Sequence, residues 1–151
     1  MALLTTGGRR RPAGPGWLRV LDPATLRLLS PVEATTPWPR AVADGGGATW
    51  IAGDGAVPQR TAPDGERRTL RAPGVEFLAG GALWTLTRDG VLQRRDPVTG
   101  RASGPPLDVG GHATSLATGP GVVWVGLRDR AVVRVDPAGP SVTWTRDVPV
   151  T

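Results

Sequence analysis

The single histidine, His112, is the side chain in this sequence with the chemistry of a general base, because imidazole has an unperturbed pKa close to neutral pH. His112 lies in the segment VGGHATSL, just before an apolar run that we read as a strand. A histidine in such a loop can transfer a proton, contact a ligand or simply face solvent. We predict that His112 binds a ligand, and we assign no catalytic residue.

Trp38 is the second residue that we predict to bind a ligand. The chain contains six tryptophans. Three of them recur at one position of an internal repeat described below, and identical placement in every repeat favours packing over a single binding site. Trp38, Trp17 and Trp144 lie outside that position and are better candidates for ligand contact, with burial at a sheet edge as the alternative. Trp38 also aligns with His112, just before an apolar strand.

Other catalytic and metal-binding chemistries are excluded by residue type and spacing. The absence of cysteine rules out disulfides, thiolate metal sites and cysteine nucleophiles, and one histidine supplies no zinc-ligand spacing. The run Gly45-Gly46-Gly47 precedes a strand and not a helix with lysine, so it is no phosphate-binding loop. None of the four serines lies in a Gly-x-Ser-x-Gly pattern of hydrolases. We therefore expect no metal and no cofactor.

The positive charge of the chain does not indicate a nucleic-acid partner. The net charge of +5 comes from 18 basic residues, all of them arginine, against 13 acids. Arginine without lysine, together with abundant glycine, alanine and proline, indicates the codon usage of a G+C-rich, bacterial genome. The excess is concentrated in Arg9, Arg10 and Arg11. The tryptophans lie mostly in apolar segments and do not alternate with basic residues, as base-stacking surfaces require.

Length and composition favour one domain and leave order and disorder open. With 22 glycines and 16 prolines among 151 residues, the chain lies at the edge of the range typical of low-complexity disorder. No apolar run approaches the roughly 18 residues of a membrane span. The first residues lack the basic start and apolar core of a signal peptide. The cytoplasm is therefore the default expectation for the location of the chain.

An internal repeat in the sequence indicates a folded domain and argues against disorder. The segments 48–63, 82–97 and 122–137 align without gaps, and in each a tryptophan precedes a proline by thirteen residues. An arginine lies at one shared position between them. The recurring residues are Trp50, Trp84 and Trp124, Arg60, Arg94 and Arg134, and Pro63, Pro97 and Pro137. With Pro23 added, the prolines lie 40, 34 and 40 residues apart, which is the spacing of four-stranded propeller blades.

Each repeat reads as four short antiparallel strands. The first is an apolar run, at residues 41–43, 75–79 and 113–118. The second carries the tryptophan and is almost continuously apolar, as at 122–127, which is typical of a strand buried on both faces. A third, alternating strand is followed by a turn at the recurring proline, which aspartate precedes in two of the three repeats. The fourth strand is more polar, at residues 67–71, 107–109 and 141–148. No segment has helical periodicity, so we predict an all-β fold.

These repeats, with an apolar-Trp-apolar strand and the sequence Asp96-Pro97-Val98-Thr99-Gly100, resemble those of YVTN-type and streptogramin-lyase-like β-propellers. The resemblance covers roughly residues 16–150 and is strongest over 83–137. It implies four-stranded antiparallel blades, in proteins that serve as lyases, lactonase-like enzymes, quinoprotein-like domains or binding scaffolds.

The resemblance also implies a role for His112, because in the lyase-like proteins a histidine near the start of an inner strand is the general base, beside glutamates that hold magnesium. Here the strand tryptophans are followed by Ile51-Ala52, Thr85-Leu86 and Val125-Gly126. The acid typical of the lyases is absent from those positions. The glutamates of the chain are Glu33, Glu66 and Glu76.

The repeats divide the chain into blades. We predict a disordered stub over residues 1–15, with 3–6 as a candidate strand, a partial blade over 16–37, and complete blades over 38–71, 72–111 and 112–151. A ring of six to eight blades needs roughly 240 to 320 residues. The chain is therefore expected to be a fragment of a larger propeller or one half of a homodimer, and its partners are the remaining blades or a second copy.

The functional hypothesis that follows is a non-catalytic β-propeller segment that acts as a ligand-binding or protein-interaction scaffold for an unidentified small molecule or protein. The alternative is a fragment of a streptogramin-lyase-like or lactonase-like enzyme that is completed by further blades. A third interpretation is the sensor portion of a larger regulatory protein.

Overall fold

The computed structural model of the chain describes residues 2–5, 15–29, 33–37, 39–45, 47–53, 56–62, 64–71, 74–80, 82–128, 131–139 and 141–147. All regular secondary structure in these ranges is β-strand, which confirms the all-β prediction. None of these residues forms a helix with the length and apolar character needed to cross a bilayer.

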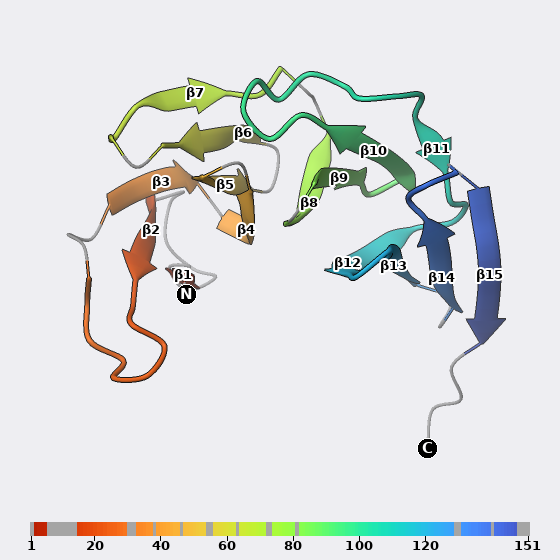
Figure 1. The fold of residues 1–151 in the computed structure, drawn as a ribbon, viewed down its shortest axis with the longest axis horizontal. Coiled ribbons are helices and arrows are strands. Elements are labelled where there is room, and N and C mark those ends of the chain that lie inside the picture. The colour runs from red at the N-terminus through yellow and green to blue at the C-terminus, as the bar shows by residue number, and fades with distance from the viewer. Residues whose placement is uncertain are drawn as a thin grey trace.

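The strands pair into four antiparallel sheets, which we call blades 1 to 4 (Figure 1). Blade 1 contains β1 (Ala2–Thr5), β2 (Pro15–Val20) and β3 (Glu33–Pro37). Blade 2 contains β4 (Pro39–Gly45), β5 (Ala48–Gly53), β6 (Ala56–Thr61) and β7 (Arg67–Thr69). Blade 3 contains β8 (Val75–Ala79), β9 (Leu83–Thr87), β10 (Val91–Arg95) and β11 (Leu107–Asp108). Blade 4 contains β12 (Ala113–Gly119), β13 (Val122–Leu127), β14 (Ala131–Asp136) and β15 (Ser141–Asp147).

The prediction of three four-stranded blades and one partial blade is confirmed. Within each blade, strands that are consecutive in sequence are neighbours in the sheet. Short strands separated by turn residues pair in this way because the turn brings the ends of both strands together before any distant contact forms. The sheets of blades 2, 3 and 4 lie within the ranges predicted for them, 38–71, 72–111 and 112–151.

Blade 1 differs from the prediction in two places. Residues 2–5, inside the stub predicted to be disordered, form β1 and pair with β2, at the place of the candidate strand 3–6. Residues 6–14 of that stub lie outside the described residues. The outer strand, expected before residue 30, is instead β3, at Glu33–Pro37. The chain first makes a turn that is closed by a bridge between Leu21 and Leu28, and β3 begins after it.

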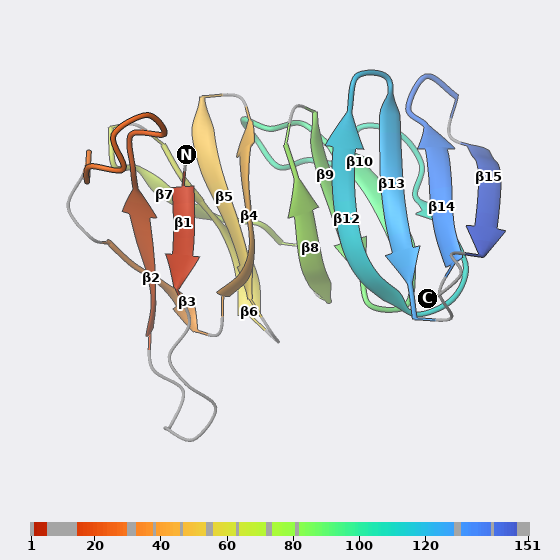
Figure 2. The same cartoon turned by 90° about the horizontal axis from the view of Figure 1, so that it is seen from below.

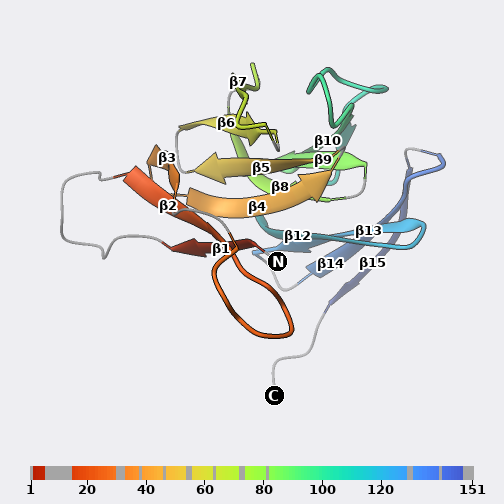
Figure 3. The same ribbon diagram turned by 60° about the vertical axis from the view of Figure 1, so that its left-hand side comes forward.

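The four blades follow one another along an arc (Figures 1 and 2). The strands β4, β8 and β12 lie along its inner side, and β7, β11 and β15 lie along its outer side (Figure 1). Each blade therefore faces its neighbours in the chain. Blade 4 forms one end of the row in all three views, including the turned view of Figure 3.

Among the described residues, two clusters of buried apolar side chains lie between neighbouring blades. The cluster between blades 2 and 3, which we call seam 2/3, contains Ala43, Trp50, Ala52, Leu70, Val75, Leu78 and Leu83. The cluster between blades 3 and 4, seam 3/4, contains Ala79, Trp84, Leu86, Leu92, Val109, Ala113, Val123, Val125, Val133 and Val135. Each seam removes apolar area from water at roughly 25 cal/mol per Å², so blade-to-blade contact is the main stabilising interaction.

Burial of the tryptophan-bearing strands depends on whether a blade has a neighbour on both sides. Most residues of β5 and β9 are buried, as predicted for strands between two sheets. For β13 the prediction of burial on both faces is wrong: Val123 and Val125 are at most 1% exposed, whereas Val122 and Trp124 are half-buried. The reason is that blade 3 covers one face of blade 4, and no other described sheet covers the opposite face.

We call this second surface the open face of blade 4. It contains Val122, Trp124, Val132 and Arg134, which share one side of β13 and β14 because side chains alternate along a strand.

The Asp-Pro turns have a defined hydrogen-bond pattern. The Asp96 carboxylate accepts hydrogen bonds from the backbone N–H of Val98 at 3.0 Å, and from the N–H and hydroxyl of Thr99 at 2.6 and 2.8 Å. Gly100 follows with φ of 72° and donates its N–H to the Asp96 carbonyl at 2.7 Å. Glycine is favoured there because residues with a Cβ adopt this left-handed conformation at a cost.

The first Asp-Pro turn repeats this pattern with one exception. Asp22 accepts the N–H groups of Ala24 and Thr25 at 2.7 and 3.1 Å. The glycine position is taken by Leu26, which has φ of 58° and is 66% exposed. Leucine therefore adopts a left-handed conformation at a place where the third blade has glycine.

The Asp96 turn predicts a pH-dependent contribution to stability. The hydrogen bonds from the Thr99 N–H and hydroxyl hold the pKa of Asp96 below its ordinary value. A carboxyl group whose pKa is lowered in the folded state stabilises the fold at pH values above its unfolded-state pKa of about 3.9. This contribution is lost as the pH falls through the folded-state pKa. Asp96→Ala should therefore be less stable than the wild type at pH 7, and the difference should vanish in acid.

Urea unfolding of both proteins between pH 2 and 7 measures this difference. Asp89→Ala is the matched control, because the Asp89 side chain lies in an Asp-Gly turn and makes no hydrogen bond to the described residues. A loss of stability in Asp96→Ala that is the same at pH 2 and pH 7 would contradict the prediction.

Candidate functional site

His112 lies at the entrance to β12, the inner strand of blade 4. Its backbone carbonyl accepts the N–H of Arg128 at 2.8 Å, and the next residue, Ala113, donates its N–H to the Arg88 carbonyl at 2.8 Å. These bonds hold the loop against the ends of β9 and β13. The His112 side chain is half-buried and makes no hydrogen bond within the described residues.

The structure does not test whether His112 and Trp38 lie together, because Trp38 lies outside the described residues. Of the other two irregular tryptophans, Trp17 is on β2 and 43% exposed, and Trp144 is on β15 opposite Arg134. Among the residues that the structure describes, no group of three or more His, Cys, Asp or Glu side chains is placed to hold a metal ion.

The repeated tryptophans and arginines are cross-strand neighbours. Trp50 pairs with Arg60, Trp84 with Arg94, and Trp124 with Arg134 in the sheet register. Directly opposed residues on one face of an antiparallel pair have Cβ atoms about 5 Å apart, so each of these tryptophans has an arginine directly opposite it on the same face of its sheet. Trp50 and Trp84 belong to the two core clusters and are 1% and 7% exposed. The predicted packing role of these two residues is therefore confirmed.

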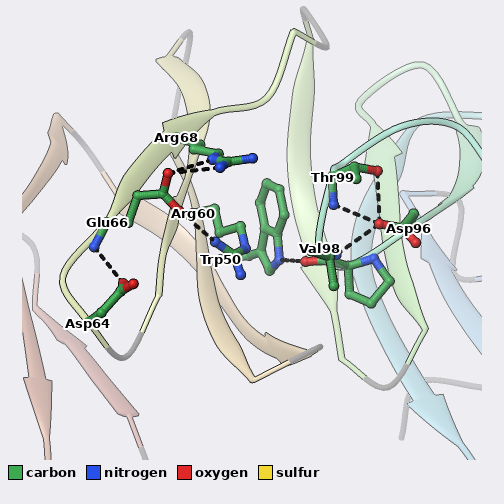
Figure 4. A network of polar contacts seen from close by, with 9 residues as sticks. Trp50, Arg60, Asp64, Glu66, Arg68, Asp96, Val98 and Thr99 are labelled. Atoms are coloured by element: carbon green, nitrogen blue, oxygen red, sulfur yellow. Dashed lines mark hydrogen bonds and ion pairs between the residues drawn. The ribbon is translucent and has the colours of Figure 1, made fainter.

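Seam 2/3 is closed around Trp50. The indole N–H of Trp50 donates to the Pro97 carbonyl of blade 3 at 3.0 Å (Figure 4). A Cβ at Gly100 would lie 3.0 Å from the Trp50 ring and 2.5 Å from the Leu70 side chain, so the turn approaches this closely only because residue 100 is glycine. Blade 3 thus inserts its Asp-Pro turn against the tryptophan of blade 2.

Arg60 is buried beside this contact. It is 8% exposed and lies 4.0 Å from the Glu66 carboxylate, which also forms an ion pair with Arg68 at 2.8 Å (Figure 4). The Arg60 Nε atom is buried without a hydrogen-bond partner. Seam 2/3 is therefore closely packed around Trp50 and already supplies an acid to its arginine.

Seam 3/4 has the same residue types in a different arrangement. Its turn has the same length as that of blade 3, because Asp136 pairs with Ser141 as Asp96 pairs with Arg101. The glycine of this turn is Gly139, and proline stands at the position that Gly100 holds in blade 3. The Trp84 indole makes no hydrogen bond to a described residue, unlike that of Trp50, and Trp84 lies beside unfilled space.

Two cavities lie beside Trp84 in seam 3/4. The first has a volume of about 190 Å³ and the second about 480 Å³, and both are lined by Trp84, Arg94 and Pro137. Arg94 is exposed, whereas Arg60 at the equivalent position is buried. Chemically, the site offers an aromatic ring, an indole N–H and a guanidinium to a molecule that enters the seam. His112 is not among the lining residues of either cavity.

Sequence reasoning did not find this site because it treated the three Trp-Arg positions as equivalent. The signal that distinguishes them is the residue four positions after aspartate in the Asp-Pro turn of the following blade. That residue is Gly100 in blade 3, where it approaches the Trp50 ring, and proline in blade 4.

Comparison with known proteins identifies no family from sequence. No protein-family profile matches the chain, and no curated protein is similar to it in sequence.

Solved structures show similarity in fold. The chain is similar to the glutaminyl cyclase of Myxococcus xanthus, with a TM-score of 0.61 and 19% identity, over 87% of this chain and 62% of that one. It is similar to a chain of the mitotic checkpoint complex, with a TM-score of 0.70 and 14% identity, over 88% and 44% of the two chains. It is also similar to the computationally designed Ika8 protein, with a TM-score of 0.67 and 15% identity, over 92% and 48%.

At these identities the similarities establish the fold alone. In each case most of this chain matches only part of the other, so the chain spans about half to three-fifths of the length of these structures. The arc of four blades and this partial coverage agree: the described residues form a section of a β-propeller.

Proposed function

We propose that the chain is a section of a larger β-propeller that serves as a non-catalytic scaffold for binding, with repeats of the YVTN type. His112 and Trp38 remain the residues proposed to contact a ligand from the loops before the inner strands. The observation that carries the scaffold proposal is the open face of blade 4. A surface of this composition, continuous with a packed sheet, marks an interaction site.

The open face carries the same residue types at the same register positions as seams 2/3 and 3/4. At seam 2/3 the tryptophan packs against the Asp-Pro turn of the following blade, and at seam 3/4 Trp84 shares two cavities with Pro137 of the following blade. Trp124 and Arg134 occupy the same register positions in blade 4. A further blade that presents an Asp-Pro turn would continue this series and bury the half-exposed side of β13.

A further blade fits this surface better than a second copy of the chain does. The turn that a second copy would offer from its blade 1 carries Leu26 at the glycine position. At the equivalent place in blade 3 even a Cβ would lie within 3.0 Å of the tryptophan ring. The proposed partner is therefore a blade whose Asp-Pro turn has glycine at this position.

Extension of the chain tests this proposal. A copy of residues 72–111, which contains the Asp96–Gly100 turn, is appended after residue 151. Docking of this blade should slow amide hydrogen exchange in β13 at least about tenfold, because burial against a packed sheet stabilises its hydrogen bonds. The matched control carries Gly100→Leu in the appended copy and should show a smaller effect. Exchange is measured by mass spectrometry.

Two results would contradict the proposal. One is unchanged exchange in β13 of the extended protein. The other is sedimentation of the 151-residue chain as a stable dimer that Trp124→Ala dissociates, since this would assign the open face to a second copy.

A further inference from the structure

We propose that seam 3/4 binds a small monocarboxylate with an apolar body, whose carboxylate contacts Arg94 and whose body lies against the Trp84 ring. This inference does not depend on what covers the open face, because Trp84 and Arg94 belong to blade 3 and face blade 4.

Charge indicates an anionic ligand. Among the described residues that line the two cavities, Arg94 is charged and none is Asp or Glu. The Arg94 guanidinium makes no ion pair or side-chain hydrogen bond within the described part of the chain. Guanidinium presents a planar fork of donors that matches the two oxygens of a carboxylate. Arg60, by contrast, already lies beside Glu66.

The walls of the smaller cavity indicate an apolar ligand body. Besides Trp84, they include Leu92, Leu107, Val135 and Pro137. The volume of about 190 Å³ is enough for one ring, since an apolar cavity of about 150 Å³ accepts benzene. A ligand with an aromatic or branched aliphatic body of similar size would bury these walls, while its carboxylate reaches Arg94.

The two polar donors of the site have no hydrogen-bond partner among the described residues. At seam 2/3 the Pro97 carbonyl accepts the hydrogen bond of the Trp50 indole N–H. At seam 3/4 the Trp84 N–H makes no hydrogen bond to a described residue. A carboxylate has two oxygens, so it can accept from the indole and the guanidinium together.

Titration with benzoate tests the proposal on the 151-residue protein. Binding is followed by calorimetry and by the indole N–H signals in NMR spectra, and we expect a dissociation constant on the order of 1 mM, typical of a ligand with so few atoms. Benzyl alcohol, which keeps the ring and lacks the charge, should bind at least about tenfold more weakly. Arg94→Ala should weaken benzoate binding by a similar factor, and Trp84→Phe should weaken it while keeping the aromatic wall.

Matched controls separate this site from general attraction to a basic protein. Arg101→Ala removes an exposed arginine outside both cavities, and Trp124→Ala alters the open face; neither should change benzoate affinity. If benzoate binds Arg94→Ala as tightly as the wild type, or if benzyl alcohol and benzoate bind equally, the proposal is wrong. If Trp84→Phe unfolds, Arg94→Gln, at an exposed position, gives the same test without disturbing the core.

Discussion

Gly100→Ala should lower the free energy of unfolding by about 2 to 5 kcal/mol. Two costs add: a residue with a Cβ at positive φ costs about 1 to 2 kcal/mol, and overpacking a filled contact costs about 1 to 3 kcal/mol. The new Cβ would lie 2.5 Å from the Leu70 side chain and 3.0 Å from the Trp50 ring. Either the ring and Leu70 move, or the turn of blade 3 withdraws and seam 2/3 opens.

Gly47→Ala is the control that separates the two costs. Gly47 has φ of 70°, close to the 72° of Gly100, and nothing lies within 4 Å of a Cβ built there. Its replacement should cost only the backbone part, about 1 to 2 kcal/mol. Urea unfolding followed by circular dichroism gives both values. Equal losses for the two variants would show that the close approach of Gly100 to Trp50 does not stabilise the seam.

Replacing the three repeated tryptophans should give a graded loss of stability. Trp50→Ala should cost about 3 to 5 kcal/mol, the range for a large buried aromatic side chain. Trp84→Ala should cost less, because part of its ring already borders cavities. Trp124→Ala should cost the least, about 1 to 2 kcal/mol, since a half-buried side chain removes less area from water. Denaturant titration of the three variants orders them.

The order of the losses is what tests this account. Equal losses at Trp50 and Trp124 would mean that the open face is as well packed as seam 2/3, against the burial of β13. Trp50→Phe adds a finer measurement, because it keeps a six-membered aromatic ring and removes the indole N–H that donates to Pro97 together with the rest of the five-membered ring. The lost hydrogen bond should account for about 1 kcal/mol of its cost, and the smaller ring adds a packing loss.

Strand positions could be read from sequence because each strand is short and ends at a marked turn. Segment 122–127 was predicted with the bounds that β13 has, since Gly121 precedes this apolar run and Arg128 follows it. The prediction failed for β3, whose own sequence gives no such signal. β3 contains Thr35, Thr36 and Pro37, and apolar and polar residues do not alternate along it. It is held in place by pairing with β2, a contact that local sequence does not reveal.

Burial was harder to predict than strand position. The apolar composition of β13 is that of a strand between two sheets, yet one of its faces is half-exposed. The apolar composition of β13 suits a strand with a sheet on each side, but the described structure places a sheet on only one side of it. The open face is identified by this disagreement between the composition of β13 and its observed burial.

The candidate site in seam 3/4 could not be predicted from residue types. Trp84 and Arg94 are identical in type and spacing to Trp50 and Arg60, and the structure makes one pair closed and the other accessible. The difference lies in another blade, in the Asp-Pro turn that faces each tryptophan: four residues after the aspartate, the turn that faces Trp50 has glycine and the turn that faces Trp84 has proline. His112 and Trp38 were chosen because the equivalent positions of the other repeats carry different residues. This criterion does not detect a residue that the repeats share but whose surroundings differ from one repeat to the next.

The pairing of consecutive strands within every blade has a consequence for how such a chain can change. Because each blade touches mainly its sequence neighbours, its stability is close to a sum of unit and nearest-neighbour terms, as in a one-dimensional array. Duplicating one unit of about 40 residues therefore alters an end and leaves interior contacts intact. Each copied unit can then exchange a turn residue independently of the others, and a turn without glycine at the position of Gly100 can leave the tryptophan that it faces as the wall of a new pocket.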